Sequence, residues 1–332
     1  MPKKYHVAIV GATGAVGIEL LRVMERRNFP VADLRLFASA RSAGRQLEFR
    51  GSGFPVETLE PDSFKGIDLA FFSAGSERAK QLAPLACAAG AVVIDNSSAF
   101  RMEADVPLVI PEINPDDALT HRGLIANPNC TTAVALMALY PLHRAFGLRR
   151  VFASSYQAVS GSGARAIDEL KRQIEASSRG AEIAPEVYPH PIAFNLLPHV
   201  DSFLENGYTK EEMKMQNEGR KIMHLRSFTA SVTCVRVPVY RAHSVAMSAE
   251  FERPISLEAA RTALAQAPGL DLVDEPFSDR YPMPLDVAGK DHCQAGRLRV
   301  DCALENGLAL WVCGDQLLKG AALNAVQIAE VL

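Results

Sequence analysis

The sequence predicts an α/β protein in which a doubly wound parallel sheet is followed by a second, α+β domain with a mixed sheet. Two observations carry this prediction. Over residues 1–129, short apolar runs alternate with helical patterns, as in a parallel sheet with crossover helices. Beyond residue 130 the apolar runs are longer, and the last two are joined through Glu305-Asn306-Gly307, an Asn-Gly signal for a hairpin.

The individual elements are expected from the same periodicities. In the first part the pattern predicts helices near residues 15–27 and 77–89 and strands at 6–10, 34–38, 68–72, 91–94 and 107–110. In the second part it predicts helices near 163–176, 209–223 and 256–266 and strands at 151–159, 229–238, 245–252, 297–304 and 308–313. We therefore expect domains at 1–129 and 130–314, with a last helix within 315–332 that packs back on the first domain.

Composition excludes several classes of protein. The chain has 332 residues, 48% of them hydrophobic, which is enough for two buried cores, and its 35 basic and 38 acidic residues leave no excess of positive charge for nucleic acid. No apolar stretch approaches the ~20 residues that span a bilayer. Met1-Pro2-Lys3-Lys4-Tyr5 leads directly into a strand, unlike a signal peptide. Six scattered cysteines indicate reduced thiols and no metal site, so we expect a cytoplasmic protein.

A glycine-rich turn links the first strand to the first helix. Gly11-Ala12-Thr13-Gly14-Ala15-Val16-Gly17 follows the run His6–Val10 and precedes an amphipathic stretch. Glycines at such a turn let the backbone approach a pyrophosphate, which the N-terminus of the helix then stabilises. The spacing is G-x-x-G-x-x-G, and a plain tight turn is the alternative. The strand before it and the helix after it favour a Rossmann-like domain that binds a dinucleotide.

The end of the second strand bears on which nicotinamide cofactor is bound. NAD sites usually place a carboxylate there for the ribose 2′-hydroxyl. Here Ser39, Arg41 and Ser42 follow the strand instead, and an arginine fork with two hydroxyl groups suits a 2′-phosphate. This favours NADP, and the alternative is a solvated basic loop.

Cys130 is the candidate nucleophile. It follows the turn Asn127-Pro128-Asn129 and opens the helical pattern Ala133–Tyr140. The N-terminus of a helix favours a thiolate over a thiol through its dipole and its unpaired N–H groups. The alternative is a buried structural cysteine, which is the usual state of this residue type.

Polar residues of the second part lie where predicted strands end or begin. Tyr156–Gly163 contains Gln157 at the end of a strand, and Arg236 and His243 flank the connection between two further strands. A guanidinium suits a carboxylate, and an imidazole titrates near neutrality. Each of these residues taken alone is more often structural than functional.

Seven motifs taken together carry a family resemblance. They are Gly11–Gly17, Ser97–Arg101, Asn127–Thr132, Tyr156–Gly163, Glu211–Lys214, Arg236–His243 and Gly314–Gly320. In order and spacing they resemble the aspartate-semialdehyde dehydrogenases, and they span almost the entire chain. The resemblance implies that L-aspartyl 4-phosphate is reduced by NADPH to L-aspartate 4-semialdehyde with release of phosphate, toward lysine, methionine and threonine. It also implies a homodimer whose interface comes from the second, catalytic and dimerisation domain.

The resemblance assigns roles to individual residues. Cys130 resembles the acyl-thioester nucleophile, and His243 the general acid/base. Gln157 resembles the residue that orients either the acyl group or the nucleophile of the hydrolysis direction. The substrate ligands are Arg101 and Lys214 for phosphate, Arg236 for the α-carboxylate, Glu211 for the α-ammonium, and Asn129. Because Glu212 adjoins Glu211, either carboxylate fits that position. The cofactor contacts are Gly11, Thr13, Gly14, Ala15, Val16, Ser39, Arg41, Ser42, Ser160, Gly161 and Gln316.

Two other functions are consistent with parts of this pattern. N-acetyl-glutamyl-phosphate reductases use the same thioester chemistry, but their cysteine usually follows Pro-Gly, whereas Asn129 precedes Cys130 here. Their N-acetylated substrate would also have no free ammonium for Glu211. A non-catalytic NADP-binding paralogue should have lost its nucleophile or its base, yet Cys130 and His243 are both present.

Overall fold

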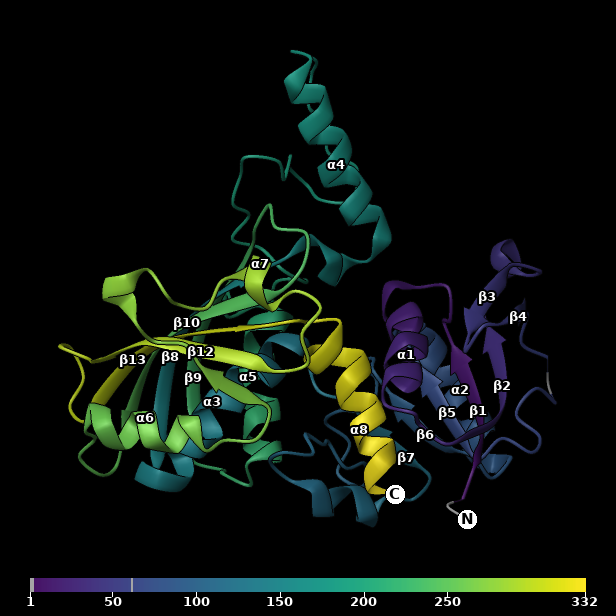
Figure 1. Cartoon of the computed structure of the whole chain (residues 1–332), viewed down its shortest axis with the longest axis horizontal. Coiled ribbons are helices and arrows are strands. Elements are labelled where there is room, and N and C mark those ends of the chain that lie inside the picture. The colour runs from purple at the N-terminus through teal and green to yellow at the C-terminus, as the bar shows by residue number, and fades with distance from the viewer. Residues whose placement is uncertain (1–2, 61) are drawn as a thin grey trace. The chain divides into compact units, whose positions relative to one another are not determined.

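A computed structural model of the chain describes residues 3–60 and 62–332. Met1 and Pro2 lie outside the described residues. They begin the N-terminal segment that the sequence predicts to be unlike a signal peptide. The chain forms two compact units, one made of residues 1–129 and 321–332 and the other of residues 130–320 (Figure 1). No helix within the two described ranges is both long enough and apolar enough to cross a membrane.

The first unit is built on a mainly parallel sheet. In the described residues its strand order is β3-β4-β2-β1-β5-β6-β7, and every neighbouring pair is parallel except β3 with β4. The strands are β1 (Tyr5–Val10), β2 (Val31–Phe37), β3 (Gln46–Phe49), β4 (Ser52–Glu57), β5 (Leu69–Phe72), β6 (Val92–Asp95) and β7 (Leu124–Ala126). From β4 to β7 this is the doubly wound order of dinucleotide-binding sheets, which bind ligands at the C-terminal ends of their strands.

Helices α1 (Ala15–Arg26), α2 (Ser76–Ala88) and α8 (Leu323–Val331) cover this sheet, together with the short 3-10 turns η1 (Ala40–Ser42) and η2 (Pro115–Thr120). The buried face of α1 is mainly apolar and includes one charged residue, Glu19, and α1 packs against α8. From α8, the Asn324 Nδ2 donates to the Val109 carbonyl at 2.9 Å and to Asn127 Oδ1 at 2.7 Å. The end of the chain is thereby tied to the segment that leads to Cys130.

The second unit contains a mixed sheet with the order β11-β12-β13-β10-β8-β9. Its strands are β8 (Leu148–Gln157), β9 (Thr229–Arg236), β10 (His243–Phe251), β11 (Leu270–Leu272), β12 (Cys293–Val300) and β13 (Gly307–Gly314). The β8–β9 and β11–β12 pairs are parallel, and β10 is antiparallel to both β8 and β13. The prediction of a mixed second sheet is confirmed.

The register of this sheet gathers the predicted polar residues at one end. Gln157 is the last residue of β8 and pairs with Arg236, the last residue of β9. His243 begins the antiparallel strand β10 and pairs with Gly314, where β13 ends. The four positions therefore lie at the same end of the sheet. Strands β8, β9 and β13 end there, and the antiparallel strand β10 begins there.

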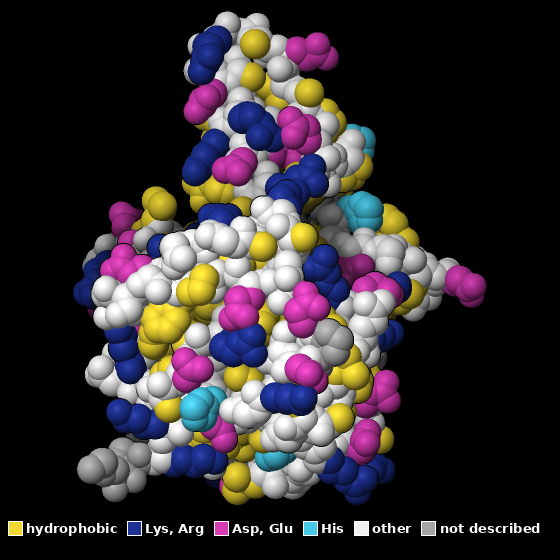
Figure 2. Space-filling model, turned by 90° about the vertical axis from the view of Figure 1, so that its right-hand side faces the viewer, with side chains coloured by type: hydrophobic (Ala, Val, Ile, Leu, Met, Phe, Trp, Pro, Cys, Tyr) yellow, Lys and Arg dark blue, Asp and Glu magenta, His cyan; other side chains and the backbone are white. Residues whose placement is uncertain are grey.

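The helices of the second unit are α3 (Cys130–Phe146), α4 (Ala164–Ser178), α5 (Lys210–Ile222), α6 (Leu257–Ala265) and α7 (Pro284–Val287), with 3-10 turns η3 (Val159–Ser162) and η4 (Pro276–Ser278). Helix α3 is buried along most of its length and packs on β8, β10 and β13. Helix α4 projects from its sheet (Figure 1) and carries interspersed acidic and basic side chains at the top of Figure 2. Its apolar side packs on Ile192 and Leu197.

The expected strand at 107–110 was wrong. Only Leu108 forms a bridge, to Ala126. The Asn114 side chain explains the difference, since its Oδ1 accepts from the Ile110 N–H at 2.9 Å and its Nδ2 donates to the Leu108 carbonyl at 2.9 Å. A side-chain amide thus takes the backbone groups that a strand partner would have used.

The hairpins also differ from the prediction. Strand β12 ends at Val300, and residues 301–306 form a longer loop in which Asn306 has φ 50° and the Asp301 N–H bonds to the Gly307 carbonyl at 2.9 Å. The two-residue turn occurs instead between β3 and β4, a hairpin that the sequence pattern missed. There Arg50 and Gly51 both have positive φ, 51° and 73°, as a type I′ turn requires. The last helix begins late, at Leu323, after a π-helical turn η5 (Leu318–Ala322).

Candidate active site

Glycine is required at two positions of the turn between β1 and α1. Gly11 has φ +92°, and a Cβ there would lie 2.3 Å from the Ser73 carbonyl oxygen. A Cβ at Gly17 would lie 2.4 Å from the Gly11 carbonyl oxygen. At both positions the backbone lies so close to a carbonyl group that a residue with a side chain would clash with it. Gly14, the N-cap of α1, has no side chain to cap the helix, so the first N–H groups suit an anion.

A hollow of about 260 Å³ lies at the C-terminal ends of the strands of the first unit. Its lining residues are Val10, Gly11, Ala38, Ser39, Ala40, Thr58, Leu59, Ala74, Arg78, Gln81 and Leu82. The predicted contacts Gly11 and Ser39 are among them. Arg41 lies beside it on η1 with its side chain exposed, and Ser42 is buried, with Thr13 Oγ1 donating to its Oγ at 3.5 Å. A close-approach glycine turn beside such a hollow fits a dinucleotide.

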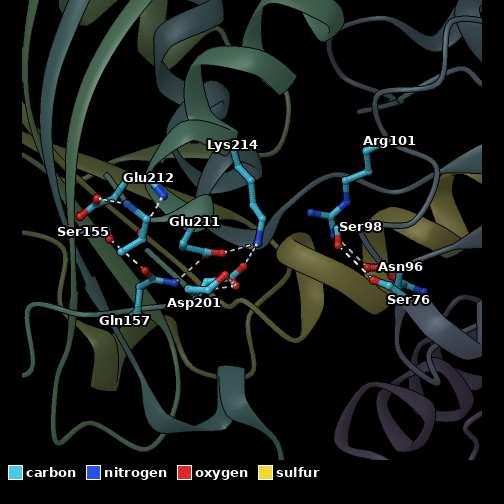
Figure 3. A network of polar contacts seen from close by, with 12 residues as sticks. Ser76, Asn96, Ser98, Arg101, Ser155, Gln157, Asp201, Glu211, Glu212 and Lys214 are labelled. Carbon is cyan, nitrogen blue, oxygen red and sulfur yellow. Dashed lines mark hydrogen bonds and ion pairs between the residues drawn. The ribbon is translucent and has the colours of Figure 1, made fainter. Parts of the chain in front are cut away.

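Arg101 is held in place by backbone carbonyl groups of the first unit. Its Nε donates to the Asn127 carbonyl at 2.8 Å and its Nη2 to the Asn96 carbonyl at 2.9 Å. The side chain is buried. Arg101 is the last residue of the Ser97–Arg101 motif, in which Ser98 Oγ lies 3.0 Å from Ser76 Oγ (Figure 3). The guanidinium is therefore fixed in orientation before any ligand arrives.

Helix α3 begins at Cys130, as predicted from the turn that precedes it. The side chain is half-buried and Asn129 beside it is buried. The π-helical turn η5 packs against this point, because a Cβ added at Gly320 would lie 2.7 Å from Cys130 Cβ. π-helical turns are frequent at functional sites. Cys130 therefore lies at the N-terminus of α3, next to this turn.

His243 is fully buried in a defined tautomer. Its Nδ1 accepts a hydrogen bond from the Ala158 N–H at 3.1 Å, which places the imidazole proton on Nε2. Within the described residues, Nε2 is buried and has no hydrogen-bond partner. Burial, with a further contribution from the Arg236 charge, lowers the pKa of His243 from 6.5 to about 3. The neutral ring therefore offers an N–H donor and not a lone pair.

Arg236 lies beside this imidazole. A Cβ at Gly161 would lie 3.0 Å from Arg236 Nη1 and 3.3 Å from His243 Nε2, so both groups border the same glycine. Arg236 Nη1 donates to the Ala158 carbonyl at 2.8 Å, while its Nε is buried without a partner in the described part of the chain. The guanidinium carbon lies 5.9 Å from the centre of the Tyr188 ring. A buried guanidinium with a donor to spare suits a carboxylate.

Gln157, Glu211 and Lys214 form a hydrogen-bonded chain (Figure 3). Gln157 Nε2 donates to Glu211 Oε1 at 3.0 Å, and Lys214 Nζ donates to Glu211 Oε2 at 2.6 Å. The Ser155 hydroxyl donates to Gln157 Oε1 at 3.1 Å, which fixes the orientation of the amide. Burial alone would lower the pKa of Lys214, but Glu211 and Asp201 outweigh burial and raise it. Lys214 is therefore a charged ammonium.

Glu212 has a different role from its neighbour. Its Oε2 accepts from the Thr209 N–H at 2.7 Å and its Oε1 from the Cys234 N–H at 2.9 Å. Thr209 Oγ1 in turn accepts from the Glu212 N–H, completing a capping box at the start of α5. Both oxygens of Glu212 thus bind the backbone, while Glu211 faces the polar chain.

Two of the predicted cofactor contacts bond to each other. Gln316 Nε2 donates to Ser160 Oγ, and Gln316 Oε1 accepts from the Ala242 N–H at 2.8 Å. Next to them, Asp315 accepts from Arg241 Nε at 2.5 Å and from the Gly289 N–H at 2.6 Å. These bonds brace the loop between Arg236 and His243. Among residues 3–60 and 62–332, no cluster of three His, Cys, Asp or Glu side chains is arranged to hold a metal ion.

Comparison with known proteins accounts for nearly the whole chain. Residues 6–121 match the family model "Semialdehyde dehydrogenase, NAD binding domain", and residues 139–319 match "Semialdehyde dehydrogenase, dimerisation domain". Aspartate-semialdehyde dehydrogenases of Synechocystis sp. and Aquifex aeolicus are 51% and 52% identical to it, over 100% and 99% of this chain and 98% of each relative. The chain belongs to the aspartate-semialdehyde dehydrogenase family.

A solved structure of the same family agrees with this assignment. Aspartate semialdehyde dehydrogenase II from Vibrio cholerae, crystallised with ASA, is 44% identical and has a TM-score of 0.97, covering 99% of this chain and 98% of its own. The family predicted from seven motifs and the predicted fold class are both confirmed. The chain is thus an oxidoreductase of the aspartate-semialdehyde dehydrogenase type with a domain for a nicotinamide dinucleotide.

Several residues that complete the polar clusters were missed by sequence reasoning. Ser155 lies two positions before Gln157 on β8, and residues at i and i+2 share a face of a strand, so this signal was present. Arg78 lines the hollow from α2, and Asp201 bonds to Lys214 from an irregular segment. No local pattern marks either of these two.

Proposed function

We propose that this member of the aspartate-semialdehyde dehydrogenase family reduces L-aspartyl 4-phosphate to L-aspartate 4-semialdehyde with NADPH and releases phosphate, as a step toward lysine, methionine and threonine. The observation that carries the proposal is the set of charges at one end of the second sheet. A buried guanidinium, a carboxylate paired with an ammonium, and a neutral imidazole lie there, in the unit whose helix α3 begins at Cys130. This set is complementary to an amino-acid side-chain acyl phosphate.

In this reaction Cys130 acts as the nucleophile. Its sulfur forms a bond to the acyl carbon, the bond from that carbon to the phosphate oxygen breaks, and phosphate leaves with the electron pair. The product is a thioester, which accepts hydride where a carboxylate would not. When bound, NADPH supplies that hydride. The carbonyl then re-forms as the carbon–sulfur bond breaks, which releases the aldehyde and returns the sulfur as thiolate.

His243 is proposed to stabilise the oxygen on which negative charge develops. Nδ1 accepts from the Ala158 N–H, so the imidazole proton is on Nε2. Of the two roles in acid/base catalysis, the free imidazole therefore supports that of the proton donor. Burial, and to a smaller extent the positive charge of Arg236, lowers the pKa of His243 and keeps the ring neutral. Gln157, whose amide is fixed by Ser155 and Glu211, is proposed to orient the acyl group.

The remaining residues are proposed to bind the three charged ends of the substrate. Arg236 is assigned to the α-carboxylate and Glu211 to the α-ammonium. Glu212 is not assigned, because backbone N–H groups of a helix cap and of β9 hold its carboxylate, whereas Glu211 bonds to the side chains of Gln157 and Lys214. Arg101 and Lys214 are assigned to phosphate, and Asn129 to the acyl end beside Cys130. Such fixed ends orient the acyl carbon, an effect that contributes several kcal/mol to many enzymatic reactions.

The cofactor is proposed to be NADP and not NAD. Gly11, Thr13, Gly14, Ala15 and Val16 form the turn for the pyrophosphate, and residues 38–45 beyond β2 contain no carboxylate to repel a 2′-phosphate. The phosphate would be held by Arg41, Ser39 and Ser42. Ser160, Gly161 and Gln316 are proposed to border the nicotinamide end.

Replacing Arg41 with alanine should therefore raise the Kd for NADPH about tenfold and change the Kd for NADH by less than about twofold, since only NADPH carries the 2′-phosphate. Fluorescence titration with each nucleotide measures both constants. Arg45→Ala is the matched control, because this exposed arginine lies in the same loop. Equal losses for both cofactors in Arg41→Ala would disprove the assignment.

A homodimer is proposed through the second unit. Residues 139–319 match a dimerisation domain, and large apolar side chains are exposed on the same unit. They are Phe152, Phe194, Leu196, Phe203, Phe277 and Leu285. Light scattering on the purified chain should give twice the mass of one chain, and a monomer at micromolar concentration would contradict the proposal.

The cellular location is proposed to be the cytoplasm. The six cysteines all lie in the described part of the chain and none of them forms a disulfide, which fits a reducing compartment. Fractionation of cells with an antibody to the chain tests this, and recovery outside the cytoplasmic fraction would contradict it.

The proposed reaction is tested in its phosphorylating direction. Phosphate-dependent reduction of NADP is measured with aspartate 4-semialdehyde and, in parallel, with N-acetylglutamate semialdehyde. Turnover with the first aldehyde alone supports the proposal. Turnover with the second alone would assign the chain to the N-acetyl-glutamyl-phosphate reductase reaction, and binding of NADP without turnover of either would indicate a non-catalytic paralogue.

A further inference from the structure

Lys214, the proposed phosphate ligand, is bonded to two carboxylates and not to one (Figure 3). Its Nζ lies 2.6 Å from Glu211 Oε2 and 3.0 Å from Asp201 Oδ2. Two negative charges around one positive charge leave this cluster with a net charge of about −1. A phosphate group that approaches Lys214 therefore meets repulsion as well as attraction.

The two carboxylates are held in different ways. The Glu211 side chain is 7% exposed, and its Oε1 also accepts from Gln157, so it is fixed within the buried chain. The Asp201 side chain is 36% exposed and lies on the irregular segment between α4 and α5, where its Oδ1 accepts from the Ser202 N–H at 2.8 Å. Asp201 is thus the partner that can separate from Lys214 at the lower cost.

The charges of this pair are maintained in the free protein. Burial raises the pKa of Asp201, but the bond to Lys214 and the Ser202 N–H outweigh burial and lower it. An ion pair at a partly exposed site is of modest strength, because solvent screens it. A dianionic phosphate presents more charge and more acceptor oxygens to the same ammonium.

We propose that Asp201 is the resident counter-ion of Lys214 and that the phosphate of the substrate displaces it. The inference rests on the proposed function, in which Lys214 binds phosphate. Asp201 then pairs with Lys214 again as phosphate leaves, so it sets the affinity for phosphate without touching the reacting carbon. It is a positioning and specificity-determining residue for the anion.

Asp201→Asn tests this role because it keeps the size of the side chain and removes its charge. In phosphate-dependent NADP reduction, the KM for phosphate should fall about three- to tenfold, while the KM for aspartate semialdehyde changes by less than about twofold. Glu205→Gln is the matched control. It removes an exposed carboxylate from the same segment, where no bond to Lys214 forms, and should leave the phosphate KM unchanged.

A double-variant cycle isolates the contact. In a Lys214→Gln background, Asp201→Asn should no longer lower the phosphate KM, because the ammonium for which phosphate and carboxylate compete is gone. A phosphate KM that rises or stays the same in Asp201→Asn alone would overturn the proposal. If Asp201 served only to hold Lys214 in place, its removal would weaken phosphate binding and raise this KM.

The failure of this inference can be told apart from failure of the proposed function. If the wild-type chain turns over aspartate semialdehyde with phosphate but Asp201→Asn behaves like wild type, only the counter-ion role is disproved. If the wild-type chain shows no phosphate-dependent turnover, the proposed function fails and this inference fails with it.

Discussion

Cys130→Ala is expected to abolish phosphate-dependent turnover, lowering kcat by at least about 10⁴-fold, while the Kd for NADPH stays within about twofold of wild type. The reason is that the Cys130 sulfur is the atom proposed to carry the acyl group, so its removal eliminates the covalent route. The glycine turn proposed to bind the nucleotide is unchanged by this substitution. Steady-state rates and nucleotide titration on the same preparation measure the two effects.

Cys87→Ala is the matched control for this experiment. Cys87 is also half-buried, but it lies on α2 and its thiol donates to the Gly123 carbonyl at 3.2 Å. This variant should keep full activity apart from a modest loss of stability. Wild-type rates in Cys130→Ala would exclude the thioester route.

His243→Ala is expected to lower kcat by about 10²- to 10⁴-fold with little change in the KM for the semialdehyde. The loss follows from the Nε2 proton, which is buried and has no partner among the described side chains and backbone groups. His243→Gln should recover part of the rate, because its amide supplies an N–H donor near the same place. Equal rates in the two variants would contradict a donor role.

The pH dependence separates a donor from a general base. Because the pKa of His243 is lowered to about 3 by burial and by Arg236, the ring stays neutral throughout the neutral range. The pH profile of wild-type kcat/KM should therefore lack a limb near 6.5 that belongs to this residue. A limb near 6.5 that disappears in His243→Ala would show that the ring accepts a proton in the free enzyme.

The same shift has a consequence for stability, and its sign is fixed by linkage. As pH falls below 6.5 the unfolded chain binds a proton at this imidazole, while the folded chain does not until about pH 3. Between these values the free energy of unfolding should fall with decreasing pH by about 1.4 kcal/mol per unit from this residue. Denaturant unfolding of wild type and His243→Ala at pH 7 and pH 5 checks this. An equal change in the free energy of unfolding between the two pH values in both proteins would contradict it.

Features that depend on local sequence were predictable. The glycine turn and the start of α3 at Cys130 each follow from neighbouring residues, because a strand, a turn and a helix are adjacent in the chain. The gathering of Gln157, Arg236 and His243 was anticipated only from their places at strand ends. Their actual proximity comes from the register of β8, β9 and β10, which pairs residues far apart in sequence.

Other features needed the three-dimensional structure. Asp201 bonds to Lys214 from a segment without regular periodicity, so no pattern connects the two. Asn114 replaces a strand partner through its side chain, which a count of apolar residues does not detect. By contrast, the choice between Glu211 and Glu212 was open to sequence reasoning. Thr209 followed three residues later by Glu212 is a capping-box pattern, and it assigns Glu212 to the helix.

The central claim is that the Cys130 sulfur is transiently acylated. Mixing the enzyme with aspartate semialdehyde and NADP in the absence of phosphate should give a burst of NADPH near one per chain. Acid quenching and mass spectrometry of the digested chain should then find one aspartyl group on the peptide that contains Cys130. A burst without that adduct, or an adduct on another residue, would contradict the account.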